Sequence, residues 1–243
     1  MNTVAIVQAR MGSTRLPGKV LKPLCGDSVL SRVLERLKAV PSIDAIVVAT
    51  TTSIEDDLIV EEAKANEVHI YRGSEKNVLS RYYEAAELYG ADGIVRVTSD
   101  CPLIDPEITE EVIKTFYKME VDYMSNKTTP TFPRGLDIEV FTRDALEISY
   151  RNAYNDVHTE HVTPYIYLHP EQFTISEYNS PVDYSRYRWT LDTEEDYKLI
   201  TEIYNYLHQP DKIFGWRQVI ALMERIPDLP LINQHIEQKK LGE

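Results

Sequence analysis

The sequence has few cysteines, an excess of acidic over basic residues, and no long hydrophobic run. Two cysteines among 243 residues are too few for a disulfide framework and favour a reducing compartment. The net charge of -13 argues against a nucleic-acid-binding surface, which needs a basic stripe. No stretch is apolar over a membrane-spanning length, and the first residues carry no signal-peptide pattern. We therefore expect a cytoplasmic protein with neither nucleic-acid nor membrane partners.

Two common phosphate-binding motifs are also missing. There is no G-x-G-x-x-G, and the P-loop spacing is broken because five residues separate Gly12 from Gly18 and Val20 follows Lys19. Nevertheless, residues 8–19 follow an apolar run and carry Arg10, Arg15 and Lys19 beside two glycines. A cationic loop between a buried strand and a helix is how many α/β proteins hold phosphates. The sequence favours a polyphosphate site here over the alternative, a solvated basic turn.

Apolar, β-branched runs alternate with amphipathic segments through the first half of the chain. The pattern predicts strands at 4–9, 45–50, 69–71 and 93–98, and helices at 29–39, 53–66, 78–89 and 106–119. In the helix expected at 53–66, Ser53 is the candidate cap, and Ile54, Leu58 and Ala65 are expected to face the core. Continuously apolar strands, each followed by a helix, indicate a parallel sheet covered on both faces.

This alternation breaks after residue 121. Strands are expected at 122–126, 136–142, 173–178 and 188–191, and helices over 143–168, 194–207 and around 216–225. No flexible linker or internal repeat divides the chain. We expect a single α/β domain over 1–243, with a small projecting α+β insertion at 145–186.

Two aspartates follow strands of the predicted sheet. Asp100 comes after the strand at 93–98, and Asp192 comes after the segment 188–191. Because the carboxyl ends of parallel strands meet at one edge of a sheet, the two carboxylates are expected to share one Mg²⁺ ion. The alternatives are a helix cap for Asp192 and a cap or turn for Asp100. The Asp-x-Asp of glycosyltransferases with a similar fold is absent, since Pro102 occupies its third position.

Residues 9–19, Ala-Arg-Met-Gly-Ser-Thr-Arg-Leu-Pro-Gly-Lys, resemble the signature of the cytidylyltransferases that activate acidic sugars, the CMP-Kdo and CMP-sialic acid synthetases. Within that family the chain is most similar to the branch of spore coat polysaccharide biosynthesis protein F. Further motifs follow in the family's order: Gly73-Ser74-Glu75, Arg96-Val97-Thr98-Ser99-Asp100-Cys101-Pro102-Leu103, Gly135-Leu136-Asp137-Ile138-Glu139-Val140, Glu160-His161-Val162-Thr163-Pro164-Tyr165 and Trp189-Thr190-Leu191-Asp192. The resemblance covers nearly the whole chain and implies a Rossmann-like fold of the nucleotide-diphospho-sugar transferase type.

The resemblance also implies an activity and a set of site residues. The reaction would be Mg²⁺-dependent transfer of CMP from CTP to an acidic or modified sugar, with release of pyrophosphate, in surface polysaccharide or glycan biosynthesis. The expected catalytic residues are Arg10, Lys19, Asp100 and Asp192, with both aspartates on the metal. The expected nucleotide contacts are Ala9, Arg10, Met11, Gly12, Ser13, Arg15, Lys19, Arg72, Ser74, Asn77, Val78 and Ser99. The expected sugar contacts are Arg134, Asp137, Glu139, Glu160, His161 and Arg188. A homodimer through 145–186 is implied as well.

Several alternatives stay open at this point. The family's usual Ser-Gly-Thr-Asp-Arg in the base-reading region is not kept, which leaves the preference for CTP open. Arg81 is either a ligand or a solvated or paired cation. His158 and His161 have a spacing that suits a transition metal, but no third ligand is recognisable. The alternative functions are a nucleotidyl- or glycosyltransferase with another nucleotide or acceptor, and a non-catalytic nucleotide-binding subunit.

Overall fold

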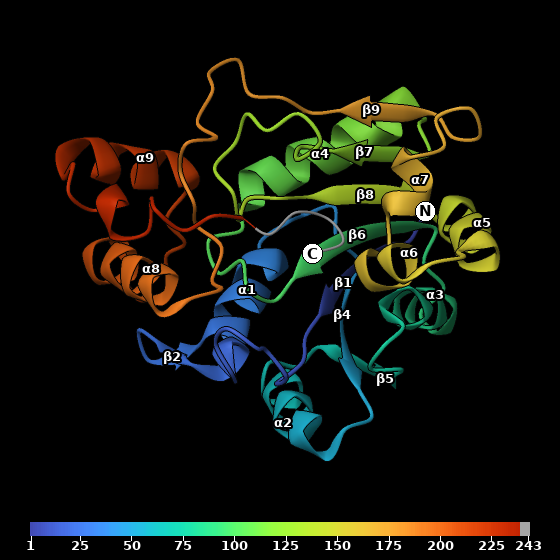
Figure 1. The fold of residues 1–243 in the computed structure, drawn as a ribbon, viewed down its shortest axis with the longest axis horizontal. Helices are drawn as coiled ribbons and strands as arrows, with labels where there is room; N and C mark the ends of the chain where they lie inside the picture. The colour runs from blue at the N-terminus through green and yellow to red at the C-terminus, as the bar shows by residue number, and fades with distance from the viewer. Residues whose placement is uncertain (239–243) are drawn as a thin grey trace.

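A seven-stranded sheet runs through the middle of residues 1–238, which are the residues that this computed structural model describes (Figure 1). Its order is β5-β4-β1-β6-β8-β7-β9. The strands are β1 (Thr3–Gln8), β4 (Ala45–Thr51), β5 (His69–Gly73), β6 (Gly93–Thr98), β7 (Tyr123–Ser125), β8 (Glu139–Thr142) and β9 (Ile175–Glu177). β4 and β6 are parallel to β1, β5 is parallel to β4, and β9 is parallel to β7, whereas β8 is antiparallel to both of its neighbours. The predicted mostly parallel α/β sheet is confirmed.

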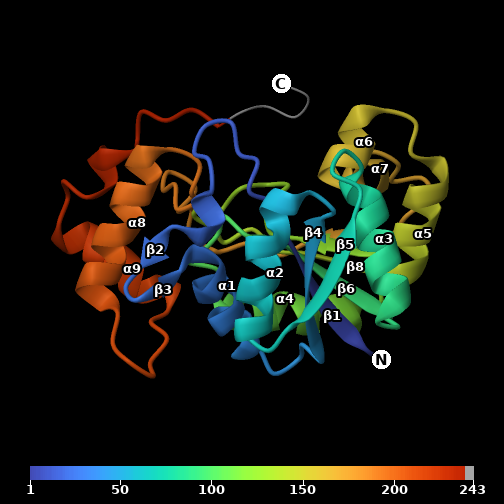
Figure 2. The same ribbon diagram turned by 90° about the horizontal axis from the view of Figure 1, so that it is seen from below.

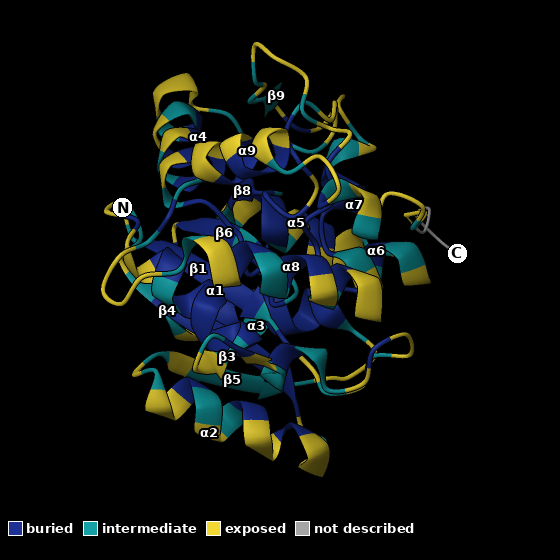
Figure 3. Cartoon of the chain, turned by 90° about the vertical axis from the view of Figure 1, so that its left-hand side faces the viewer, coloured by how far each residue is buried: buried dark blue, intermediate teal, exposed yellow. Residues whose placement is uncertain are grey.

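Helices cover both faces of the sheet (Figures 1 and 2). One face carries α1 (Val29–Lys38), α2 (Asp57–Ala65), α4 (Pro106–Met119), α8 (Glu194–Leu207) and α9 (Trp216–Arg225). The other face carries α3 (Val78–Leu88), α5 (Arg143–Asn152), α6 (Asp156–His161) and α7 (Pro164–Tyr167). Most residues of the central strands, which lie between these two layers, are buried (Figure 3). A small hairpin of β2 (Pro23–Leu24) and β3 (Asp27–Ser28), and the 3₁₀ turns η1 (Lys19–Leu21), η2 (Ile54–Asp56) and η3 (Pro230–Ile232), complete the described elements.

The predicted buried face of α2 was wrong. Ile54 and Leu58 are 82% and 59% exposed, Ala65 is exposed too, and the core positions are Ile59 and Ala63. The reason is that Ser53 begins a 3₁₀ turn rather than the helix, and the buried residue of that turn is Asp56. The Asp56 carboxylate accepts hydrogen bonds from the Met11 amide at 2.7 Å and from the Thr51 hydroxyl. The hydrogen bonds of the buried Asp56 therefore determine which face of α2 points to the core.

Two predictions for the second half of the chain also need correction. Residues 188–191 do not form a strand; they run as an extended segment in which the Trp189 amide donates to the Arg134 carbonyl at 2.6 Å. The helix expected over 143–168 is divided into α5, α6 and α7. These three helices pack with α3 over one face of the sheet, and β9 then forms a sheet edge. Within residues 1–238, no helix combines the length and the apolar character needed to cross a membrane.

Candidate active site

The cationic loop of residues 9–19 follows β1 at the carboxyl edge of the sheet. Its path is fixed from within, because the Met11 carbonyl accepts hydrogen bonds from the amides of Ser13 at 2.9 Å and Gly18 at 3.1 Å. Gly18 adopts φ +66°, in the left-handed region that favours glycine. Among residues 1–238, no acceptor binds the amides of Arg10 and Gly12. The Gly12 amide is thus free for a ligand, whereas the Ser13 amide, also expected as a donor, is already used.

Lys19 brings the loop and the two predicted acids together. Its Nζ lies 2.7 Å from Asp100 Oδ2 and 2.8 Å from Asp192 Oδ1, although the three residues are far apart in sequence. Arg15 also reaches Asp192, with Nη2 3.0 Å from Oδ2. The Leu191 amide donates to the Asp100 carbonyl at 2.8 Å, which fixes one acid next to the other. Cations and carboxylates from three distant segments therefore share one place at the edge of the sheet.

The charges at this place are mutually stabilised. Burial alone would lower the pKa of Lys19, but Asp100 and Asp192 outweigh it and raise that pKa. Burial alone would raise the pKa of Asp100, but the Lys19 ammonium outweighs it and lowers that pKa to about 2. At neutral pH the lysine is therefore protonated and Asp100 is ionised. A charged ammonium beside an ionised carboxylate is the state that suits phosphate and metal chemistry.

Asp192 is positioned by Arg188. Arg188 Nη2 lies 2.9 Å from Asp192 Oδ2, while its Nε and Nη2 also bind Asp196 at 2.9 and 3.0 Å. Its Nη1 donates to Gln238 at 2.6 Å. The guanidinium thus has its Nε, Nη1 and Nη2 engaged with side chains of the protein, and two of these partners are Asp192 and Asp196.

Neither aspartate caps a helix, but Asp100 does lie in a turn, directly after β6, which is the other alternative for this residue. The N-cap of α8 is Thr193, whose hydroxyl accepts from the Asp196 amide at 3.2 Å. The N-cap of α4 is Asp105, which accepts from the Ile108 amide at 3.1 Å. Both aspartates contact the cations of the loop, and Asp100 Oδ1 also accepts from the Cys101 thiol at 3.6 Å.

These two carboxylates fit a Mg²⁺ ion. Both have an oxygen within 2.8 Å of the same Lys19 nitrogen, so they converge on one point. Mg²⁺ in proteins is commonly held by one or two carboxylates together with substrate phosphates and water. Within residues 1–238, no cluster of three or more histidine, cysteine, aspartate or glutamate side chains is arranged to hold a metal. The donor set thus matches a metal that arrives with a phosphate ligand.

The residues expected to read the nucleotide base are used in local structure. Arg72 donates to the carbonyls of Thr51 and Ser53, both at 2.8 Å, and to Asp57 Oδ1 at 2.6 Å. The Ser74 hydroxyl accepts from the Asn77 amide at 3.1 Å. Of the other expected nucleotide contacts, Asn77 is the N-cap of α3, and its side chain binds within the helix end. Ala9, Val78 and Ser99 are buried.

The region expected to bind the sugar contains a buried charge cluster that the sequence did not reveal. Glu139 is 2% exposed, and its carboxylate pairs with Arg96 and with Lys127 Nζ at 2.7 Å. The hydroxyls of Tyr123 and Thr163 also donate to it, at 2.7 and 2.5 Å. Burial alone would raise the pKa of Glu139, but the two cations lower it well below its usual range. Lys127 keeps a quarter of its side chain exposed, which makes it the accessible cation of the cluster.

The other residues expected at the sugar lie around this cluster. His161 is half-buried; burial lowers its pKa, and its charged neighbours include Lys127 and Glu160, the latter exposed. Asp137 accepts from the Gly135 amide at 3.2 Å, and its carboxylate lies 3.9 Å from Arg134 Nε. Lys127 interacts electrostatically with Asp137.

Gly135 allows the chain next to the expected sugar contacts to pack closely against the main chain of Trp189 and Thr190, which precede Asp192. It adopts φ +101°, and a Cβ at this position would lie 2.5 Å from the Trp189 carbonyl carbon and 2.7 Å from the Thr190 nitrogen. Only a residue without a side chain permits this approach of two main chains. The glycine of the motif at 135–140 is therefore required by packing.

Cys101 and His158 have structural roles. The Cys101 thiol is buried. Burial and, to a smaller extent, the charge of Asp100 raise its pKa well above the ordinary value, so Cys101 is not a thiolate nucleophile. His158 is buried among the rings of Tyr154, Tyr165 and His169, away from any metal-binding cluster within the described residues.

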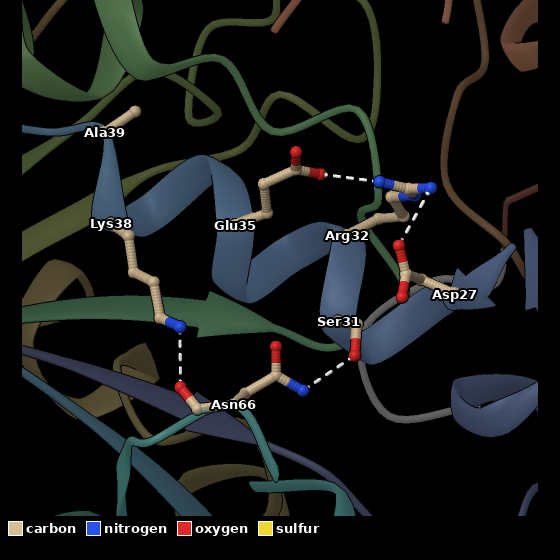
Figure 4. A pocket seen from close by; sticks show the side chains of 7 residues that line it. All are labelled: Asp27, Ser31, Arg32, Glu35, Lys38, Ala39 and Asn66. Atoms are coloured by element: carbon tan, nitrogen blue, oxygen red, sulfur yellow. Dashed lines mark hydrogen bonds and ion pairs between the residues drawn. The ribbon is translucent and has the colours of Figure 1, made fainter. Parts of the chain in front are cut away.

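A cavity of about 470 Å³ lies apart from these residues, along the outer side of α1 (Figure 4). Its polar groups satisfy one another: Arg32 pairs with Asp27 and Glu35, and Lys38 donates to the Asn66 carbonyl. It contains none of the predicted site residues. The carboxyl edge of the sheet is therefore the candidate site.

The comparisons with known proteins agree with this geometry. Residues 4–239 match the family model described as cytidylyltransferase. The chain belongs to the cytidylyltransferase family. It is 34% identical to spore coat polysaccharide biosynthesis protein SpsF of Bacillus subtilis, over 92% of this chain and 94% of that protein. A solved cytidylyltransferase from Leptospira borgpetersenii is 36% identical, covers 99% of this chain and 100% of its own, and has a TM-score of 0.91.

A more distant structure shows the same fold. It is described as CMP:2-keto-3-deoxy-manno-octonic acid synthetase complexed with CTP, with a TM-score of 0.64, 17% identity, and coverage of 85% of this cytidylyltransferase and 100% of its own chain. The predicted resemblance to the cytidylyltransferases of the CMP-Kdo and SpsF type is confirmed.

Proposed function

We propose that this cytidylyltransferase transfers CMP from CTP to an acidic sugar in a Mg²⁺-dependent reaction and releases pyrophosphate, in the biosynthesis of a surface polysaccharide or glycan. The observation that carries the proposal is the position of the Lys19 ammonium between the carboxylates of Asp100 and Asp192. Nucleotidyl transfer requires cations for the leaving pyrophosphate and a fixed position for the attacking hydroxyl. This edge of the sheet provides cations for the pyrophosphate and carboxylates that could hold a metal near the attacking hydroxyl.

Each residue has a task in that reaction. Arg10, Arg15 and Lys19 neutralise the triphosphate and then the pyrophosphate, and the free Gly12 amide adds a neutral donor. Asp100 and Asp192 would hold the Mg²⁺ ion, which when bound lowers the negative charge on the phosphate oxygens. Arg188 keeps the Asp192 carboxylate aimed at the same point as Asp100. The protein thereby holds the reacting groups in line without forming a covalent bond to them.

An acidic acceptor is supported by the cluster around Glu139. Two cations, Arg96 and Lys127, pair with the one carboxylate of Glu139. Lys127 is accessible there, and a carboxylate on the sugar would pair with it. The distant structural relative named as an octonic acid synthetase acts on a sugar of this class, which supports the same assignment.

The test is an assay of pyrophosphate release. The purified protein is incubated with each of the four nucleoside triphosphates, Mg²⁺, and a panel of sugar acids and neutral sugars. We expect release with CTP and a sugar acid, and none when the metal is chelated. Release with another triphosphate but not with CTP would show that the enzyme uses that other nucleotide. Triphosphate binding without release from any acceptor would favour a non-catalytic subunit.

A homodimer through residues 145–186 is part of the proposal. Tyr150, Tyr154 and Leu168 are large apolar residues in this segment that are 37%, 73% and 55% exposed, and contact with a second copy would remove them from water. Sedimentation velocity is expected to give a dimer, and replacing Tyr154 and Leu168 by serine is expected to give a monomer. A wild-type monomer would contradict this part of the proposal.

A further inference from the structure

The end of the described chain returns to the candidate active site. After α9, residues 226–238 turn through η3 and run along the side of the molecule that carries the loop of residues 9–19 (Figure 2). Most residues of this segment are exposed, but Asn233 is only 2% exposed. Asparagine is rarely buried so fully unless its amide has partners. The partners of Asn233 therefore indicate what this segment does.

The Asn233 amide binds two groups of the segment that carries Asp192. Its Nδ2 donates to the Arg188 carbonyl at 2.9 Å and to Asp196 Oδ1 at 2.8 Å. Burial alone would raise the pKa of the fully buried Asp196, but hydrogen bonds from Arg188 and Asn233 outweigh it and lower that pKa. Asn233 thus helps to keep Asp196 ionised and in place.

Asp196 in turn fixes Asp192. Asp196 Oδ2 accepts from the main-chain amides of Asp192 at 3.0 Å and Thr193 at 3.1 Å. Arg188 Nη2 bridges the two carboxylates, at 3.0 Å from Asp196 Oδ2 and 2.9 Å from Asp192 Oδ2. Both the main chain and the carboxylate of Asp192 therefore depend on Asp196 and Arg188, which are the two residues that Asn233 binds.

A second residue of the C-terminal segment binds the same arginine. Gln238, which is exposed, accepts from Arg188 Nη1 at 2.6 Å. Arg188 is thereby held at its carbonyl by Asn233 and at its guanidinium by Gln238. From Arg188 the contacts continue through Asp192 to Lys19, whose Nζ lies 2.8 Å from Asp192 Oδ1. A continuous set of hydrogen bonds and ion pairs thus joins the C-terminal segment to the candidate metal carboxylate.

We propose that Asn233 and Gln238 are positioning residues for nucleotidyl transfer: they hold Arg188 and Asp196 so that the Asp192 carboxylate stays oriented to bind Mg²⁺. Replacing a residue that orients a metal ligand typically changes metal affinity or activity by roughly 10- to 100-fold. The inference rests on the proposed function for the metal and the nucleotide. A merely structural role for Asn233 would lower stability but leave the effect of the metal on nucleotide binding unchanged.

The experiment measures nucleotide binding with and without metal, in the absence of an acceptor sugar. Titration calorimetry gives the dissociation constant of CTP with Mg²⁺ and with EDTA for the wild type, Asn233→Leu and Gln238→Leu. Leucine has the same branching as asparagine but no donor. We expect Mg²⁺ to tighten CTP binding to the wild type. With Mg²⁺, binding should weaken about tenfold in Asn233→Leu and about threefold in Gln238→Leu, whereas with EDTA it should stay within about twofold of the wild type.

Asn66 offers a matched control. Its Nδ2 also donates to one carbonyl, that of Glu62 at 2.9 Å, and to one side-chain oxygen, Ser31 Oγ at 2.7 Å. It lines the cavity along the outer side of α1, apart from the candidate site. Asn66→Leu should therefore keep both dissociation constants within about twofold of the wild type.

Three results would overturn the proposal. These are a folded Asn233→Leu protein that binds CTP with Mg²⁺ as the wild type does, an equal loss of binding in EDTA, and the same loss in Asn66→Leu. Should Asn233→Leu fail to fold, Gln238→Leu decides the question, because its position is exposed; unchanged binding with Mg²⁺ would then refute the inference.

Failure of the proposed function would look different. A wild type that releases no pyrophosphate with any acceptor would contradict the proposed function, yet the comparison of the variants would stay valid, since it uses no acceptor. A wild type whose CTP binding does not respond to Mg²⁺ would overturn both the metal dependence and this inference. A wild type that responds to Mg²⁺ and releases pyrophosphate, with variants that match it, would overturn the inference alone.

Discussion

Replacing Lys19 by methionine should destabilise the protein in a way that depends on pH. Methionine keeps most of the length of the side chain but removes the ammonium that lies between Asp100 and Asp192. The pKa of Asp100 is lowered from 3.8 to about 2 in the folded protein, which corresponds to about 2 kcal/mol of folding free energy at neutral pH. Without the ammonium this stabilisation disappears, and burial beside a second acid opposes ionisation instead.

The sign follows from the direction of the shift. Because the folded pKa of Asp100 is below its unfolded value, its stabilisation is fully present above the unfolded value of 3.8 and is lost as the pH falls toward 2. The difference in unfolding free energy between the wild type and Lys19→Met should therefore be about 2 kcal/mol at pH 7 and about half of that at pH 3. Urea unfolding at several pH values measures it.

Two further variants make the test specific. Lys22→Met removes a lysine whose partner, Glu194, is largely exposed, and it should cost less than about 1 kcal/mol. In the double variant Lys19→Met/Asp100→Asn the carboxylate is gone as well, so much of the lost stability should return. A Lys19→Met deficit that is the same at pH 3 and pH 7, or one that Asp100→Asn does not relieve, would refute the reasoning.

Three other substitutions test the site. Gly135→Ala should destabilise the protein by at least about 2 kcal/mol in urea unfolding, because its Cβ would lie 2.5 Å from the main chain of Trp189; wild-type stability would show that the two segments separate easily. Arg188→Met should lower kcat more than tenfold with a smaller change in KM for CTP, since Asp192 loses its orienting partner; an unchanged kcat would contradict that role. Glu139→Gln leaves two cations without their carboxylate and should cost about 3 kcal/mol or more in thermal or urea unfolding, and a change below about 1 kcal/mol would mean that the cluster is solvated.

Features that depend on neighbours in sequence or on general sheet rules could be predicted. The continuously apolar runs identified β1, β4 and β6, because buried parallel strands have no solvent-facing positions. The meeting of Asp100 with the loop that carries Lys19 followed from the rule that parallel strands end at one edge. Both features need only local patterns and one property shared by all such sheets.

Features that depend on a tertiary partner could not be predicted. Nothing near Lys127 in the sequence indicates that it pairs with Glu139, because the two residues come from different segments that meet only in the folded sheet. The buried face of α2 depended on Asp56, whose partner Met11 is 45 residues away. Arg81 was open between a ligand and a solvated or paired cation, and the structure shows a buried arginine that forms no ion pair within residues 1–238. Long-range polar contacts of this kind leave no periodic signal in a sequence.

The double ion pair of Lys19 has a consequence for the order of events during binding. While no substrate is present, two carboxylates serve as temporary counterions that keep the ammonium in position. In the proposed reaction, an arriving triphosphate would take over a cation that is already in place, and this exchange would free carboxylate oxygens for a metal. The loop is organised in advance, so nucleotide association spends little entropy on ordering it, and metal and nucleotide should each bind more tightly when the other is present.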